Sequence, residues 1–274
     1  LWSFLPTYTD YYQTLTQPKA KIFDAVDDWS KHASYKNYSE RLESNYQHIN
    51  NNVDYIFVVS PHLEKKFSRN EKVYFIPNGV DFNHFQQREK IINRDIANLE
   101  HPIIGYIGTI QDRFNLDIIK AITNKMPKAS IALIGPIWYK KLRAELLKIK
   151  NVFLLGQKPY NQAPTYIQQF DVGIIPNHFD DFEKTTDPMK IYNYLACGKP
   201  VVCSYLPANE KLHPFIKVGN NPQSFADAVA QAYAEDDKDK YLERIEFAKE
   251  QSWYSRLQQI LDIILSDRHN NQVL

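Results

Sequence analysis

The residues best placed to do chemistry lie in the stretch TTDPMKIYNYLACGKPVV, residues 185–202. Asp187 suits the N-cap of a helix, and Pro188 suits its first position, where a missing N–H costs nothing. We expect the helix to stop at Gly198, because glycine favours the left-handed backbone that follows a helix. Lys190 then lies in the first turn, where the helix dipole disfavours a cation by about 0.3–1 kcal/mol.

A bound diphosphate would explain a lysine at this position. Backbone N–H groups at the helix start would hold the phosphate oxygens, and the Lys190 ammonium would neutralise their charge. Asn193, three residues further on, shares this side of the helix and could hydrogen-bond a hydroxyl of the same ligand. Two alternatives stay open, because Lys190 can also reach into solvent or pair with Asp187.

Alternating apolar runs and helical patterns from residue 102 onward predict the elements that position these residues. The expected strands are 102–108, 130–136, 151–156, 171–176, 200–205 and 215–219, with helices such as 116–126 and 139–149 between them. Strands that are apolar throughout indicate a parallel sheet covered on both faces, which is a doubly wound α/β domain. Ligands of such sheets bind beyond the carboxyl ends of the strands, which Gly108, Gly135 and Gly156 mark here.

The first hundred residues show the same α/β rhythm with fewer strands, at 21–28, 54–60 and 72–80. The expected domains are a partial N-terminal α/β domain at 1–83, a polar linker at 84–101, a complete C-terminal domain at 102–251 and a last helix at 252–274. Ser252 can cap that helix. Its apolar stripe consists of Trp253, Leu257, Ile260, Leu261 and Ile264.

Composition narrows the class of protein. The 274 residues are 43% hydrophobic and 24% charged, which fits a globular chain, and a net charge of +1 gives no global field to attract nucleic acid. Cys197 and Cys203 form neither a disulfide framework nor a zinc pattern, so we interpret them as apolar thiols in a reduced compartment. No apolar run reaches the roughly 20 residues of a membrane span, and no signal peptide is visible.

Several segments in their order along the chain resemble the donor-binding domain of GT-B glycosyltransferases, closest to the group related to glycosyltransferase family 4. They are GYIGTI, LIGP, NVFLLGQKPY, FDVGIIP and DPMKIYNYLACGKPVV. Upstream, FDAVDDWS, DYIFVVSPHLEKKF and VYFIPNGVDFNHF resemble the second half of that group's acceptor-side domain. The resemblance implies two Rossmann-like domains, with a nucleotide-sugar in the C-terminal one and a last helix that crosses back to the N-terminal one. It also implies that the start of the N-terminal domain is missing and that the chain is a fragment.

The resemblance assigns residues to a donor site. The nucleotide-sugar is expected to contact Gly108, Thr109, Gly135, Gly156, Lys158, Tyr160, Asp187, Pro188, Met189 and Asn193. Within this set the base is expected to bind backbone between Gly156 and Tyr160.

The chain departs from the family pattern at three places. Asn193 stands where family members commonly carry a Glu that holds the ribose hydroxyls, and Thr185 stands where a second Glu is common, with Glu183 two residues away. The common Arg and Lys after the first strand map onto Thr109 and Phe114. Arg113, adjacent to Phe114, is the expected replacement for the phosphate contact.

The implied function is sugar transfer from a UDP- or GDP-linked sugar to an acceptor hydroxyl, in polysaccharide or glycoconjugate biosynthesis. Such enzymes usually need no metal, so the expected catalytic groups are Lys190, Arg113 and the helix N-terminus, which stabilise the departing diphosphate. Asp27, Asp28 and His178 are weaker candidates near the acceptor, and Asp28 is the one assigned a catalytic role. Two adjacent Asp in a turn are more often solvated or cap a helix. The implied acceptor is a carbohydrate or a lipid-linked molecule. The implied location is cytoplasmic, with peripheral association with the inner face of the membrane left open.

Three other classes of function compete. A catalytically impaired nucleotide-sugar binder or partner subunit is favoured by Asn193, by Thr185 and by the short N-terminal part. A GT-B-like epimerase needs carboxylates around the sugar ring, and the sequence shows no such set. An NAD-dependent oxidoreductase is disfavoured, because GYIGTIQD lacks the G-x-G-x-x-G spacing.

Overall fold

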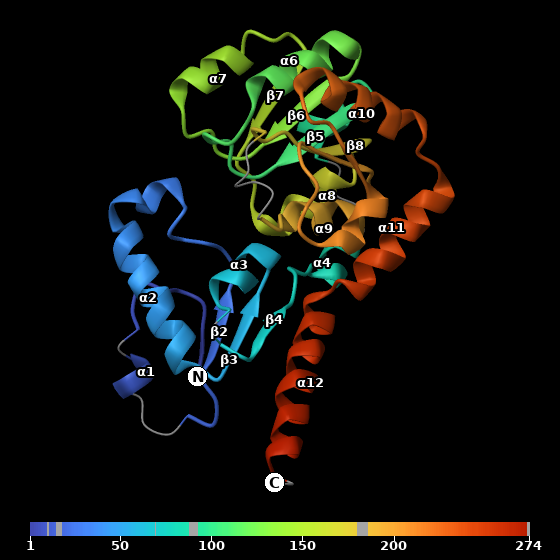
Figure 1. Ribbon diagram of the computed structural model, residues 1–274. Helices are drawn as coiled ribbons and strands as arrows, with labels where there is room; N and C mark the ends of the chain where they lie inside the picture. The colour runs from blue at the N-terminus through green and yellow to red at the C-terminus, as the bar shows by residue number, and fades with distance from the viewer. Residues whose placement is uncertain (10, 15–17, 69, 88–92, 180–185, 273–274) are drawn as a thin grey trace. The chain divides into compact units, whose positions relative to one another are not determined.

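The computed structural model describes residues 1–9, 11–14, 18–68, 70–87, 93–179 and 186–272 (Figure 1). Contacts between residues divide the chain into two compact units. Unit 1 comprises Leu1–Asn78, Thr185–Asp187 and Arg256–Leu274, and unit 2 comprises Gly79–Lys184 and Pro188–Ser255. Both are α/β units built on parallel sheets, which confirms the fold class that the sequence predicts.

The sheet of unit 2 carries the predicted carboxyl edge. Its strands within the described residues are β5 (Ile103–Ile107), β6 (Ser130–Ile134), β7 (Val152–Gly156), β8 (Val172–Ile175), β9 (Val201–Cys203) and β10 (Ile216–Val218). They are ordered β10-β9-β8-β5-β6-β7, and every neighbouring pair is parallel. From β5 the chain adds β6 and β7 on one side of the sheet and then β8, β9 and β10 on the other, so the strand order reverses between β5 and β8. A ligand is therefore expected beyond the carboxyl ends of these two strands.

Helices cover both faces of this sheet (Figure 1). One face packs against α6 (Leu116–Lys125), α7 (Lys140–Leu146) and α10 (Pro222–Ala234). The other packs against α4 (Phe82–Gln86), α5 (Arg94–Ala97), α8 (Ala163–Ile167), α9 (Met189–Ala196) and α11 (Lys238–Glu250). Successive strand residues point to opposite faces, so Ile103 joins the second core and Ile104 the first.

Residues 84–101, which the sequence suggests are a polar linker, contain secondary structure of unit 2. Phe85 of α4 and Ile96 of α5 are fully buried in its core. The polar composition misleads here, because a helix of only one turn needs a single apolar residue to dock.

The sheet of unit 1 has four strands in the described residues, one more than the sequence predicts. They are β1 (Trp2–Ser3), β2 (Ile22–Ala25), β3 (Tyr55–Val58) and β4 (Val73–Phe75), in this order and parallel throughout. The two residues of β1 are too few to show a period in the sequence. The helical segments between these strands are α1 (Tyr11–Thr14), the 3-10 helix η1 (Ala33–Tyr38), α2 (Ser39–Asn52) and α3 (Pro61–Lys66).

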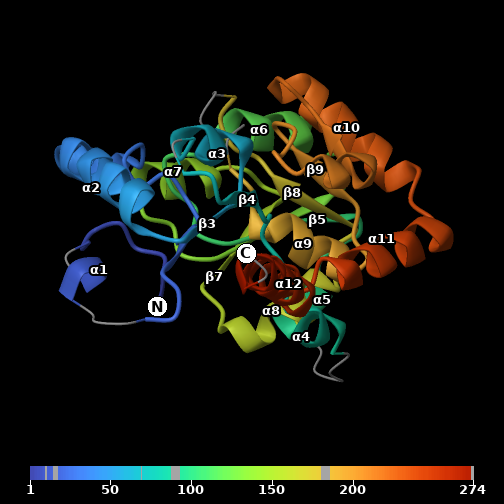
Figure 2. The ribbon, with the colours of Figure 1, turned by 60° about the horizontal axis from the view of Figure 1, so that its bottom comes forward.

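The two faces of this sheet are covered by different helices (Figure 1 and Figure 2). Phe23 and Ile56 pack with Tyr46 of α2 and Leu63 of α3. The opposite face, formed by Ile22, Tyr55 and Phe57, packs against Ile260 and Ile264 of α12 (Trp253–Gln272).

Helix α12 begins as the sequence predicts, because the Ser252 hydroxyl accepts a hydrogen bond of 3.2 Å from the backbone N–H of Ser255. Of the predicted apolar stripe, Ile260 and Ile264 are buried, whereas Trp253, Leu257 and Leu261 are exposed. No helix in the described part of the chain has the length and apolar character that crossing a membrane requires.

Candidate functional site

Two glycines shape the carboxyl edge of the unit 2 sheet. Gly108 follows β5 with a φ of 141°, and Gly135 follows β6 with a φ of 139°. A Cβ atom on Gly135 would lie 2.0 Å from the carbonyl oxygen of Gly108, so the close approach of the two strand ends requires a glycine at position 135. Thr109 continues from this edge, and its carbonyl oxygen accepts a hydrogen bond of 2.8 Å from the Tyr106 hydroxyl.

The segments that follow β5 and β8 are joined at the point where the strand order reverses. The backbone N–H of Asn115 donates to the carbonyl of Pro176 at 2.8 Å, and that of His178 donates to the carbonyl of Arg113 at 2.9 Å. These bonds place Arg113, which is half-buried, and the exposed His178 together at the carboxyl edge. Phe114 instead packs edge-on against Tyr106, with ring centroids 5.3 Å apart. The position of the common family Lys is therefore part of the core here.

Helix α9 begins one residue later than the sequence predicts, at Met189. Pro188 takes the N-cap position with extended backbone, so the prediction that Asp187 caps the helix and that Pro188 is its first residue is wrong. The buried Asp187 carboxylate accepts the backbone N–H of Asn78 at 2.7 Å, and the Asp187 carbonyl accepts the Asn78 side-chain amide at 2.6 Å. The residue before a proline favours extended backbone, so Asp187 lies outside the helix. Its carboxylate binds Asn78 of the same unit instead.

The Lys190 side chain reaches the end of β5. Its Cε atom lies 2.3 Å from the position that a Cβ on Gly108 would take, and its ammonium lies over the Tyr106 ring, 5.6 Å from the centroid. An aromatic face within about 6 Å of a cation attracts it. The structure thus brings together Gly108, Gly135, Lys190 and the first turn of α9, where the exposed Met189 also lies.

Replacing Gly108 by Ala is expected to lower the free energy of unfolding by about 2 kcal/mol, because the new Cβ combines backbone strain with a clash against Lys190. Urea denaturation of four proteins measures this: wild type, Gly108→Ala, Lys190→Ala and the double variant. In the Lys190→Ala background the clash is gone, so Gly108→Ala should cost clearly less. Equal losses in both backgrounds would show that Lys190 does not lie against Gly108.

The C-terminal end of α9 follows the predicted pattern. Gly198 has a φ of 70°, its N–H donates to Leu195 at 2.8 Å, and the N–H of Lys199 donates to Tyr194 at 2.9 Å. The Tyr194 hydroxyl accepts the N–H of Ile107 at 3.1 Å, which fixes α9 to the last residue of β5. Asn193 is half-buried on this helix, one turn after Lys190.

The segment after β7 presents backbone and aromatic surface. Gly156 is exposed with a φ of 72°. The Lys158 ammonium pairs with Asp95 of α5 at 2.6 Å, and this hydrogen bond raises the pKa of Lys158. Tyr160 is largely exposed and stacks on His84, with ring centroids 4.7 Å apart. Contact of Lys158 with a donor stays a prediction, and its present partner favours a structural role.

Asp28 lies in unit 1 within a cluster of charged groups. Its buried carboxylate lies 3.2 Å from the Lys66 ammonium, which also pairs with Glu43 at 2.7 Å. The Ser30 hydroxyl donates to Asp28 at 2.5 Å. Asp27 accepts the backbone N–H of Asp28 at 2.8 Å. A catalytic role for Asp28 stays a prediction, because these partners already satisfy a carboxylate that folding has buried.

Three features of the site were missed by sequence reasoning. Tyr106 supports Lys190, Tyr194 anchors α9 to β5, and Asn78 holds Asp187. Of these three, only Tyr194 could have been found from the sequence, because it is an aromatic residue on the buried side of a predicted helix. Glu183 and Thr185, which the sequence singles out, lie outside the described residues.

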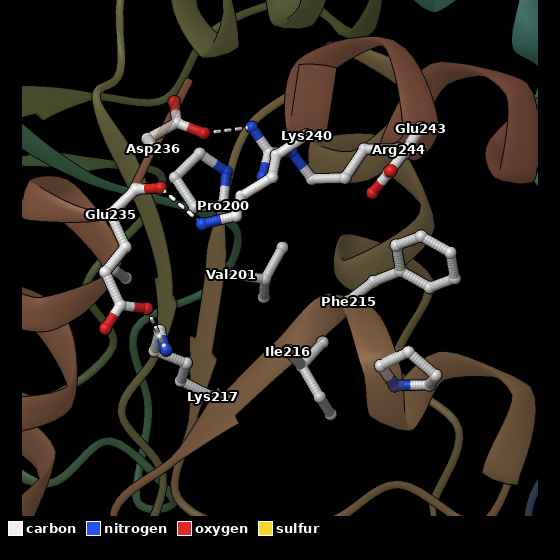
Figure 3. A pocket seen from close by; sticks show the side chains of 12 residues that line it. Pro200, Val201, Phe215, Ile216, Lys217, Glu235, Asp236, Lys240, Glu243 and Arg244 are labelled. Carbon is white, nitrogen blue, oxygen red and sulfur yellow. Dashed lines mark hydrogen bonds and ion pairs between the residues drawn. The ribbon is translucent and has the colours of Figure 1, made fainter. Parts of the chain in front are cut away.

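A separate pocket of about 190 Å³ lies where β9 and β10 begin, at the edge opposite the glycines (Figure 3). Two ion pairs lie in its lining, since Lys217 lies 2.8 Å from Glu235 and Arg244 pairs with Asp236. Arg244 also donates to the Gly198 carbonyl at 2.9 Å. These contacts identify a structural junction that holds the end of α9.

Both cysteines are free and buried, which agrees with the interpretation as apolar thiols. Burial raises the pKa of both thiols, that of Cys197 to about 12. Neither thiol is therefore a nucleophile near neutral pH.

Known proteins match both the sequence and the fold. Residues 101–235 match the family model described as Glycosyl transferases group 1. TuaH of Bacillus subtilis (strain 168), named as a teichuronic acid biosynthesis glycosyltransferase, is 26% identical over an alignment of 271 positions that covers 90% of this chain and 67% of TuaH.

Solved structures extend the match to both units. Anabaena Alr3699/HepE in complex with UDP matches with a TM-score of 0.66 at 18% identity, covering 89% of this chain and 72% of that one. Sucrose-phosphate synthase from Thermosynechococcus elongatus matches with a TM-score of 0.71 at 16% identity, covering 91% and 68%. The chain therefore has the GT-B fold of these structures, and its residues 101–235 are similar to the glycosyl transferases group 1 family.

Proposed function

We propose that this protein transfers a sugar from a nucleoside diphosphate sugar to an acceptor hydroxyl. The observation that carries the proposal is the position of the Lys190 ammonium, which α9 brings onto Gly108 where the strand order reverses. A cation and the free N–H groups of a helix start suit a diphosphate. Neighbours of the same fold were solved with UDP and with UDP-glucose, which supports a nucleotide-sugar donor.

The departing diphosphate is the charge that such an enzyme must stabilise. In our proposal Lys190 neutralises it, Arg113 contacts it from the segment after β5, and the first N–H groups of α9 bind its oxygens. Because cations are already placed there, we propose that the reaction needs no metal. The nucleotide base would rest against the backbone from Gly156 to Tyr160.

The similarity to TuaH supports a place in polysaccharide biosynthesis, with a carbohydrate or lipid-linked acceptor. A location in the cytoplasm, where nucleotide sugars are made, and peripheral contact with the inner face of a membrane belong to the same proposal.

A panel of UDP-, GDP- and dTDP-sugars tests the proposal. Calorimetry measures binding of each nucleotide, and release of nucleoside diphosphate in the presence and absence of acceptor measures transfer and hydrolysis. One nucleotide is expected to bind, and chelation by EDTA is expected to leave turnover unchanged. Failure of every nucleotide to bind would refute a donor site, and loss of turnover with EDTA would refute the metal-free mechanism.

A second function is a nucleotide-sugar binder without catalysis. Asn193 favours it, because an amide cannot supply the charge of the carboxylate common at this position. In the same panel this function predicts nucleotide binding with no release of diphosphate, and restoration of release by Asn193→Glu.

A further inference from the structure

A pocket of about 180 Å³ opens within unit 1. Its walls are the segment directly after β1 and the segment formed by η1 and the first two turns of α2, which follows β2. Both wall segments follow the carboxyl ends of parallel strands. That edge is where α/β sheets bind ligands.

Three of the seven residues that line the pocket are tyrosines. Tyr8 and Tyr38 are 72% and 59% exposed, so their ring faces are available to a ligand. Tyr35 is held edge-on by Trp29, with ring centroids 5.5 Å apart at 84°. A tyrosine ring offers an apolar face and a polar hydroxyl, which matches a sugar ring with one C–H face and a rim of hydroxyls.

Arg41 adds a single cation to these rings. It is exposed in the first turn of α2, and among the described residues no carboxylate pairs with its guanidinium. The nearby Glu43 is already bound by Lys66 at 2.7 Å. A planar guanidinium binds a carboxylate or a phosphate through two parallel hydrogen bonds, so it suits an anionic group on a ligand.

The pocket is fixed before any ligand arrives. The Asn45 side-chain amide donates to the carbonyls of Pro6 at 2.6 Å and Thr7 at 3.3 Å, which ties the segment after β1 to α2. The Asn45 side-chain oxygen remains as an acceptor for a hydroxyl. Leu42 is buried beneath the opening. A rigid wall lowers the entropy cost of binding.

We propose that this pocket binds one acidic sugar ring, with its C–H face on the tyrosines and its carboxylate or phosphate on Arg41. The volume is below the roughly 300–1,000 Å³ of pockets for drug-sized ligands, so a single ring fits better than an oligosaccharide. The assignment of this ring to the acceptor rests on the proposed function. The binding of the ring is independent of that function.

Ligand-detected NMR titration of the full chain tests the proposal with methyl glucuronide, glucose 6-phosphate and the neutral methyl glucoside. At least one acidic sugar is expected to bind about 10-fold or more tightly than methyl glucoside, as a charge-assisted contact of about 1.5 kcal/mol or more implies. The better of the two acids identifies the anionic group. Arg41→Gln should remove the preference, and Tyr38→Ala should weaken all three sugars.

Lys36→Gln is the matched control, because Lys36 is an exposed cation on η1 outside the pocket wall, and it should keep the preference. Equal binding of acidic and neutral sugars, no binding of either acid, or a preference that survives Arg41→Gln would each overturn the proposal. No donor or turnover enters this titration. A chain that binds the uronide but no nucleotide would therefore refute the transferase function and leave the pocket assignment standing.

Discussion

Replacing Lys190 by Met is expected to lower kcat/KM for sugar transfer by about 100-fold, or about 3 kcal/mol of transition-state stabilisation. Methionine retains a long apolar side chain against Gly108 and Tyr106 but lacks the ammonium that lies 5.6 Å from the Tyr106 ring centroid. The diphosphate gains negative charge as the sugar leaves it. A missing cation therefore costs most in the transition state.

The binding experiment isolates the phosphate contact. The affinity for the nucleoside diphosphate should fall about 10-fold in Lys190→Met, whereas the affinity for the corresponding nucleoside should not change. Lys120→Met serves as the control, because Lys120 is an exposed lysine of α6 in the same unit. If Lys190→Met weakened nucleoside and diphosphate equally, the lysine would shape the site without contacting phosphate.

Replacing Lys66 by Met is expected to lower the free energy of unfolding of unit 1 by about 3 kcal/mol at pH 7. The substitution leaves the Asp28 carboxylate, which is only 3% exposed, without the ammonium at 3.2 Å. It also removes the cation that the Tyr46 ring faces at 4.6 Å. Without Lys66 the Asp28 carboxylate keeps the desolvation cost of burial, and only its contacts with Ser30 and His62 remain to offset that cost.

The loss of unfolding free energy in Lys66→Met should depend on pH. Burial alone would raise the pKa of Asp28, but the hydrogen bond from Ser30 and the charge of Lys66 outweigh it and lower the net pKa. For Glu43 too, burial opposes but does not cancel the lowering of the pKa by Lys66 and Ser30. The unfolded chain therefore binds more protons in acid, so this stabilisation is complete above about pH 5 and fades as the pH falls. The difference in the free energy of unfolding between wild type and Lys66→Met should therefore become smaller from pH 7 to pH 3.

Urea denaturation followed by circular dichroism and by tryptophan fluorescence measures both effects. Lys65→Met is the matched control, since Lys65 is the exposed neighbour of Lys66 on α3 and should change stability by less than about 0.5 kcal/mol. A loss in Lys65→Met as large as in Lys66→Met, or a gap independent of pH, would assign the effect to α3 itself instead of the charge cluster.

Features that depend on neighbouring residues in the chain could be predicted from the sequence. The strands of unit 2, the left-handed Gly198 and the place of Lys190 in the first turn of α9 follow from local patterns. A run of four or five apolar residues, or a glycine after a helix, has the same backbone preference wherever the chain places it. The carboxyl edge then followed, because the strands of a doubly wound sheet run parallel.

Features that depend on partners far along the chain could not be predicted in this way. Aspartate is a favoured residue type at an N-cap, yet Asp187 binds Asn78, 109 positions earlier in the chain. Lys158 is oriented by Asp95, and the residues of the aromatic pocket come from two segments about 30 positions apart. A polar side chain takes the partner that satisfies it best once water is excluded, and sequence distance carries no information on that choice.

The sequence by itself therefore determined a doubly wound domain with a lysine at its ligand edge. Only the tertiary structure decided what each charged side chain faces. Backbone preference acts within a few residues, whereas hydrogen bonds and ion pairs form between whatever groups packing of the core brings together. For this reason Lys190 kept its predicted place, Asp187 changed its role, and Arg41 became visible as a candidate ligand contact only in three dimensions.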